Sequence, residues 1–147
     1  MQDREYNDLL NYLLDKLKQL NAIQVTNDIR QLISNGKIVE MHDTVELKKL
    51  KIKKREVGKT RTLPLTPKEA FETAIKYLEH VIIDLPLYEQ KITKAFGNNV
   101  VWKFDKGEVF NSVYTEEGYD LKNLRIDKAE IEKAKNEFKQ INKYISE

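Results

Sequence analysis

The tripeptide Gly58-Lys59-Thr60 is the first candidate for chemistry, because Gly-Lys-Thr ends the phosphate-binding loop of many nucleotide-binding proteins. Such a loop also needs a glycine five residues before Gly58, so that backbone N–H groups turn toward the phosphates. Lys53 occupies that position, and no buried strand is expected before it. The sequence therefore favours a glycine turn in a β-ribbon over a nucleotide site.

The two histidines and the carboxylates do not form the pattern of a metal site or of an acid–base pair. His42 is expected in a turn and His80 late in a helix, with no further ligands at metal-binding spacing. Asp84 and the run at 89–91 (Glu-Gln-Lys) faintly match the acidic-plus-lysine arrangement of some nucleases, but they straddle a proline-interrupted helix, which favours a solvent-exposed helix face. None of the serines has the neighbours of a nucleophile. We expect a non-catalytic protein with no metal and no cofactor.

The strongest signal is a concentration of positive charge in the basic segment, residues 48–61 (KKLKIKKREVGKTR). This segment has eight basic residues and one acidic residue, whereas residues 1–47 carry a net charge of −3 and residues 62–147 a net charge of −2. The chain as a whole carries only +2. The positive field is therefore local, unlike a general basic coating.

Alternation along the basic segment predicts a strand with one basic face. Leu50 and Ile52 point one way, and basic residues at every second position point the other way, about 7 Å apart. This distance is close to the roughly 6–7 Å between successive phosphates of one nucleic-acid strand. The expected contact residues are Lys49, Lys51, Lys53, Arg55, Lys59 and Arg61.

Three interpretations of the basic face stay open at the level of sequence. The lysines could protect an exposed strand edge from aggregation, contact nucleic-acid phosphates without reading bases, or bind an acidic protein surface. Arginine, which is favoured for base-specific contacts, is scarce in the segment.

The surrounding pattern predicts an α+β fold in a single domain spanning residues 1–147, with sub-lobes at 1–65 and 66–147. Its elements are a helical N-terminal lobe, the basic β-ribbon, a central long helix, a β-hairpin and a C-terminal helix. The leucine-rich first segment has an apolar residue every three to four positions, from Tyr6 to Leu20, and Asn35-Gly36 is expected to end the next helix.

The first strand of the ribbon is expected through residues 45–56, with a bulge near Lys48-Lys49. A turn at Val57-Gly58 and a returning strand at 59–65 are expected to follow. A strand at 37–41 precedes it.

The clearest local signal is Thr66-Pro67 with Glu69, which together predict the start of the long helix. Pro86 is expected to break or kink this helix. Residues 100–114 have the alternation of a hairpin, with Trp102 on the inward face, and a polar loop at 115–124 leads to a helix capped by Asp127.

The absence of cysteine, of a signal peptide and of a long apolar run predicts a cytoplasmic protein. Its lysine-rich composition is typical of an AT-rich bacterial or phage genome. We expect an accessory or regulatory binding protein that contacts nucleic-acid phosphates through the ribbon. The alternative is a protein–protein adaptor that uses its amphipathic helices, with a homodimer through the first helix as one form of it.

Overall fold

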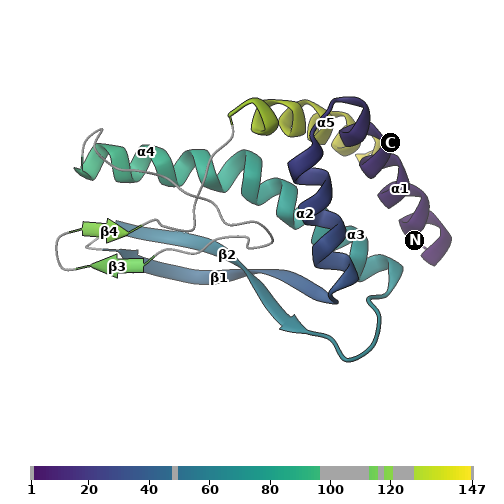
Figure 1. Ribbon diagram of the computed structural model, residues 1–147, viewed down its shortest axis with the longest axis horizontal. Coiled ribbons are helices and arrows are strands. Elements are labelled where there is room, and N and C mark those ends of the chain that lie inside the picture. The colour runs from purple at the N-terminus through teal and green to yellow at the C-terminus, as the bar shows by residue number, and fades with distance from the viewer. Residues whose placement is uncertain (1, 48–49, 97–112, 116–117, 121–127, 147) are drawn as a thin grey trace.

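The computed structural model describes residues 2–47, 50–96, 113–115, 118–120 and 128–146. It confirms the α+β fold, and helices predominate. In chain order the elements are α1 (Asp3–Gln19), α2 (Ile23–Ser34), β1 (Lys37–Leu47), β2 (Leu50–Thr60), α3 (Pro67–Glu79), the π-helical turn η1 (His80–Asp84), α4 (Leu85–Phe96), β3 (Val113–Thr115), β4 (Gly118–Asp120) and α5 (Lys128–Ser146). Helices α1, α2, α3 and α5 gather at one end, and the β1–β2 ribbon runs alongside α4 toward the other (Figure 1).

The core lies between the gathered helices. In α1, Leu9, Leu13 and Leu17 recur every four residues and are buried, as an amphipathic helix requires. Leu13 and Leu17 pack with buried residues of α2, α3, α5 and β1, among them Ile29, Leu32, Val39, Ala74, Tyr77, Leu78, Ala134 and Ile141. This cluster draws on both sides of the boundary predicted between residues 65 and 66, and the division into sub-lobes stays a prediction.

The long helix begins where the sequence predicts. Thr66 Oγ1 accepts a hydrogen bond from the Glu69 N–H at 3.1 Å, and Glu69 Oε1 accepts one from the Thr66 N–H at 3.2 Å. Pro86 does not end the helix. The π-helical η1 ends at Asp84, two residues before the proline, and spans Ile82, whose carbonyl the proline ring would crowd in a regular α-helix. The helical path therefore continues from Pro67 to Phe96.

The ribbon pairs β1 with β2 in antiparallel register, from Lys37 opposite Thr60 to Leu47 opposite Leu50. The predicted positions of its strands are therefore wrong. The chain reverses between Leu47 and Leu50, and Gly58 lies inside β2.

A different property explains Gly58: a Cβ there would lie 2.8 Å from the Ile38 carbonyl oxygen, so the neighbouring strand approaches too closely for a side chain. The irregularities in pairing fall between Lys37 and Val39 and between Met41 and Thr44.

The second sheet consists of β3 and β4, which pair from Val113 opposite Asp120 to Thr115 opposite Gly118. A strand thus occupies part of the segment predicted as a polar loop at 115–124, because Tyr114 and Tyr119 are good strand formers on either side of a two-residue connection. The predicted hairpin at 100–114 with Trp102 falls mostly outside the described residues, and so does the Asp127 cap. Helix α5 follows as predicted.

Gly36 should not tolerate a side chain. Its φ of +66° lies in the left-handed region, and a Cβ would lie 3.2 Å from the Arg61 carbonyl oxygen. We expect Gly36→Ala to lower the free energy of unfolding by about 1–2 kcal/mol, measured by urea denaturation. Ser34→Ala, at an exposed position of α2, is the control and should change it by no more than about 0.5 kcal/mol. Equal effects of the two substitutions would contradict this account.

Candidate functional site

Strand β2 carries most of the predicted contact residues, but these residues have different surroundings in the structure. Lys53 is exposed to solvent. Lys51 occupies the position opposite Glu46 of β1, and Lys59 lies near the end of β2. Lys49 falls outside the described residues. Strand β1 has three acidic residues and one lysine. Because it pairs with β2, the ribbon as a whole has a lower net positive charge than the basic segment alone.

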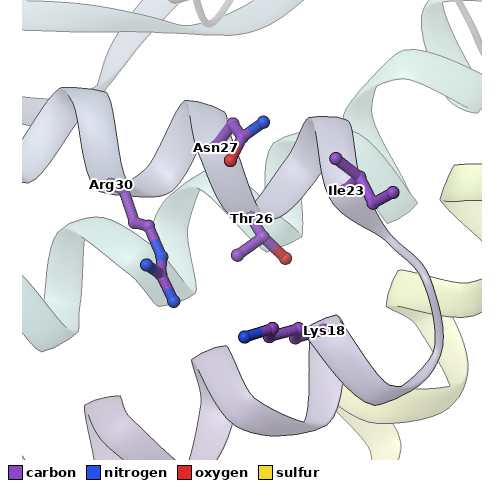
Figure 2. Close-up of a pocket in the computed structure, with 5 residues that line it drawn as sticks. All are labelled: Lys18, Ile23, Thr26, Asn27 and Arg30. Atoms are coloured by element: carbon purple, nitrogen blue, oxygen red, sulfur yellow. The ribbon is translucent and has the colours of Figure 1, made fainter.

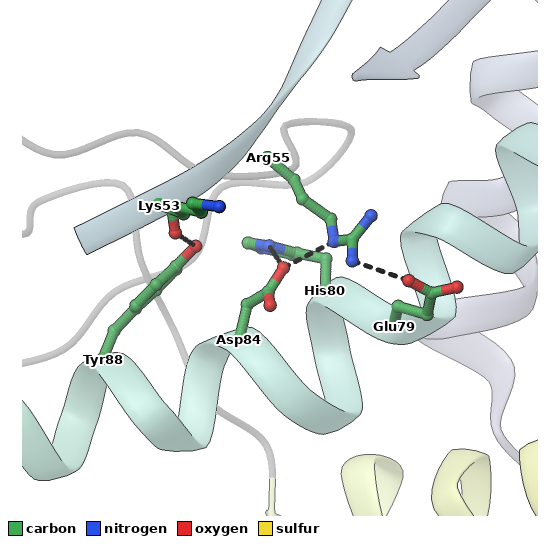
Figure 3. A network of polar contacts seen from close by, with 6 residues as sticks. All are labelled: Lys53, Arg55, Glu79, His80, Asp84 and Tyr88. Carbon is green, nitrogen blue, oxygen red and sulfur yellow. Dashed lines mark hydrogen bonds and ion pairs between the residues drawn. The ribbon is translucent and has the colours of Figure 1, made fainter. Parts of the chain in front are cut away.

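Arg55 is turned toward the long helix instead of toward solvent (Figure 3). Its Nε lies 2.6 Å from Asp84 Oδ2, and its Nη2 lies 2.6 Å from Glu79 Oε2. The Arg55 side chain is only 12% exposed, against 9% for Asp84 and 30% for Glu79. Such short charge-assisted hydrogen bonds from two edges of one guanidinium hold it in place. Its charge is therefore neutralised within the chain.

Arg61 also has an acidic partner, but at the surface. Its Nη2 lies 3.0 Å from Glu69 Oε2, and the Arg61 side chain is 56% exposed. The hydrogen bond from the Thr66 backbone, together with Arg61, lowers the pKa of Glu69. Because an exposed ion pair contributes little stability, the side chain of Arg61 is held less firmly by Glu69 than Arg55 is by its two carboxylates.

Two further side chains of the long helix complete an arrangement that we call the Arg55 cluster: Arg55, Glu79, His80, Asp84 and Tyr88. The Tyr88 hydroxyl donates a hydrogen bond to the backbone carbonyl of Lys53. Burial raises the pKa of Tyr88 and is the largest effect on it. Strand β2 is thus held to the long helix at two positions, by the side chain of Arg55 and by the backbone carbonyl of Lys53.

His80 is completely buried in this cluster. Its Nδ1 lies 3.7 Å from Asp84 Oδ2, and its ring lies beside the ring of Tyr88, with 6.3 Å between centroids. Burial lowers the pKa of His80 and outweighs the opposing effect of Asp84. This position agrees with the expectation that His80 lies late in a helix, and it places the ring in the interior. The solvent-exposed helix face expected at Asp84 is wrong, because Asp84 faces the ribbon and is buried.

A histidine, an aspartate, a tyrosine and an arginine together are also typical of catalytic sites. Here they fill the contact between the ribbon and the long helix. The arrangement is suited to holding two elements together. Sequence reasoning missed it, since the partners of Arg55 lie 24 and 29 residues away.

No cluster of three or more potential metal ligands occurs among the residues that the structure describes. In the same part of the chain no helix is long and apolar enough to cross a membrane. Comparison of the chain with protein-family models, with curated proteins and with solved structures gave no match.

Removing Arg55 should destabilise the fold, because the buried carboxyl group of Asp84 would lose its hydrogen bond from the guanidinium and Glu79 would lose its ion pair. We expect Arg55→Gln to lower the free energy of unfolding by about 2–3 kcal/mol, somewhat less than for a fully buried pair because Glu79 is partly exposed. Chemical denaturation measures the change. The matched control is Arg61→Gln, at the exposed pair, which should leave stability nearly unchanged. Similar losses in both variants would show that burial of Arg55 is unimportant.

Stability should also fall in mild acid because of His80. The unfolded chain binds a proton at His80 near pH 6.5, but the folded chain resists it until lower pH. Below about pH 6.5 the unfolded state therefore binds more protons, and the free energy of unfolding falls as the pH is lowered from about 7 to about 5.5. His80→Gln should remove this part of the pH dependence and His42→Gln should keep it. An unchanged pH profile in His80→Gln would contradict the assignment.

Proposed function

We propose that this protein is a non-catalytic accessory or regulatory protein of a bacterial or phage cytoplasm that binds nucleic-acid phosphates through the distal half of its ribbon. The distal half is the part beyond Arg55, with strand residues 41–47 of β1 and 50–54 of β2. The observation that carries the proposal is the orientation of Arg55. Because this arginine is paired with two carboxylates midway along the ribbon, the lysines beyond it are the cations left to consider for contact with another molecule.

The charges of the ribbon support this restriction. Between residues 41 and 54 the sequence has five lysines and two acidic residues. Arg55 and Arg61 both have carboxylate partners in the same chain. Among the described side chains of the distal half, Lys53 is exposed. The sequence of the distal half therefore carries a net charge of +3, counted without Arg55 and Arg61.

The type of cation favours contact with phosphates over reading of bases. The arginines of the basic segment are engaged within the chain, and the distal half supplies lysines, which act as hydrated point charges. Base-specific contacts in the major groove depend most often on bidentate arginine. Strand geometry places alternate lysines about 7 Å apart, near the phosphate spacing of one strand. Weak, sequence-independent and strongly salt-dependent binding is the expected behaviour.

The adaptor alternative has less support than the sequence suggested. Leu9, Leu13 and Leu17 of the first helix are buried within the core. This buried part of the apolar stripe is therefore unavailable for a homodimer or a docking face. An acidic protein as the partner of the lysines stays a competing outcome of the test below.

The test is binding of a short duplex and of a single strand, each measured by fluorescence anisotropy across a salt series. We expect the logarithm of the association constant to fall linearly with the logarithm of salt concentration, with a slope of about −0.9 for each phosphate contact on duplex. Replacing Lys51 and Lys53 together by glutamate should reduce the magnitude of that slope by about two. It should weaken binding to all sequences alike.

The matched control replaces Lys135 and Lys139, two exposed lysines one turn apart on α5, by glutamate. It changes the net charge by the same amount at a distant place and should alter the slope much less. Equal slopes for the two double variants would show that only net charge matters. Absence of binding to both nucleic acids at low salt, with the fold verified by circular dichroism, would overturn the proposal and leave the acidic-protein partner as the next candidate.

A further inference from the structure

A second positive surface lies on α1 and α2, outside the basic segment. It is a pocket of about 170 Å³ lined by Lys18, Ile23, Thr26, Asn27 and Arg30. In α2 the lining residues follow the spacing i, i+3, i+4 and i+7, which places them on one face of the helix. Lys18 comes from the last turn of α1 and faces them across the pocket (Figure 2).

The turn between the two helices fixes this arrangement. The Ala22 N–H donates to the Leu17 carbonyl at 2.9 Å, and the Asn21 N–H donates to the Lys18 carbonyl at 3.0 Å. With Asn21 at φ 59°, this is the Schellman motif that ends many helices. The backbone of Lys18 is thus part of a hydrogen-bonded turn, and its side chain begins from a defined place opposite α2.

Two cations point into this pocket from different helices. Figure 2 shows the Lys18 ammonium and the Arg30 guanidinium directed toward the same space. Neither forms an ion pair with a carboxylate among the described residues, and no acidic side chain lines the pocket. Two like charges that face the same space repel each other, and an anion between them would relieve this repulsion. This contrasts with Arg55 and Arg61, which both have carboxylate partners.

We propose that this pocket binds the phosphate group of a small phosphomonoester. Its volume is below the roughly 300–1,000 Å³ of sites that enclose drug-sized ligands, so it suits a single phosphate-sized group. A monoester carries a charge of about −1.5 to −2 at neutral pH, which matches two cations. The planar guanidinium of Arg30 can donate two parallel hydrogen bonds to phosphate oxygens, and the ammonium of Lys18 can approach a third oxygen.

The remaining lining residues limit what else can bind. The Thr26 hydroxyl donates to the Ala22 carbonyl at 2.7 Å, so its proton is used within α2. Ile23 is 61% exposed at the edge of the pocket and offers apolar contact to the organic part of a monoester. A phosphodiester of a nucleic-acid backbone has only one negative charge and two free oxygens, and it should bind more weakly than a monoester. The site is therefore distinct from the ribbon surface in both position and preferred ligand.

The test is a titration of the ¹⁵N-labelled full chain with inorganic phosphate and with glycerol phosphate, followed by amide chemical shifts at constant ionic strength. We expect saturable shifts around Lys18 and along the first turns of α2, with a dissociation constant in the millimolar range. Binding of glycerol phosphate should tighten as the pH rises through about 6, where a phosphomonoester takes its second charge. Dimethyl phosphate and acetate serve as the diester and carboxylate probes, and both should bind several-fold more weakly.

Arg30→Gln and Lys18→Gln should each weaken phosphate binding about tenfold or more, as expected for loss of a charge-assisted hydrogen bond. Lys135→Gln, which removes an exposed cation of α5, is the matched control and should bind phosphate normally. Because the two cations repel each other in the free protein, neither pocket variant should lower the midpoint of thermal unfolding. Shifts that never saturate would overturn the proposal. Equal binding of acetate, or normal binding by Arg30→Gln, would also overturn it.

Discussion

The contact of Arg55 with Asp84 and Glu79 determines how the ribbon lies against the helices. A two-stranded ribbon is at best marginally stable alone in water, so it needs contacts with other elements. At its base Val39 enters the apolar core. Farther along, the fastening is polar: Arg55 binds two carboxylates of the long helix, and Tyr88 binds the backbone of Lys53. Polar contacts are directional, so they define the register of the strand on the helix more narrowly than apolar packing alone would.

The π-helical turn gives this contact its geometry. In an α-helix each residue advances by about 100°, so residues five positions apart, such as Glu79 and Asp84, point about 140° away from each other. The wider η1 turn lies between them and brings their side chains nearer to the same side, where one guanidinium reaches both. Pro86 lies two residues beyond the end of this turn and disfavours a regular α-helix at that place. One local irregularity thus accommodates the proline and aligns the two carboxylates.

The sequence predicted the ends of helices correctly where the interactions that form them lie within one helical turn. Thr66, Pro67 and Glu69 predict the start of the long helix because all their interactions lie within one turn, and Gly36 predicts the end of α2 for the same reason. The ribbon was misplaced because its reversal, between Leu47 and Leu50, contains neither glycine nor asparagine, whereas Gly58 resembles a turn residue. Alternation correctly grouped Lys53 with Arg55 on β2. It could not show that a helix covers the second of these positions, because that depends on tertiary packing.

The pairing of Arg55 with two carboxylates shows why a count of charges along a sequence overstates the positive charge of a surface. The basic segment has a charge of +7 on paper, yet in the structure both of its arginines pair with carboxylates from later in the chain, and an acidic strand lies beside it. Arginine suits such buried pairing because its planar, weakly hydrated head can bind two carboxylates at once, whereas a lysine ammonium is strongly hydrated and more costly to bury. Where a strand that contains both arginine and lysine packs against carboxylates of a helix, the arginines are therefore the first cations expected to pair within the chain. The lysines, Lys53 among them, are the ones to examine for contact with another molecule.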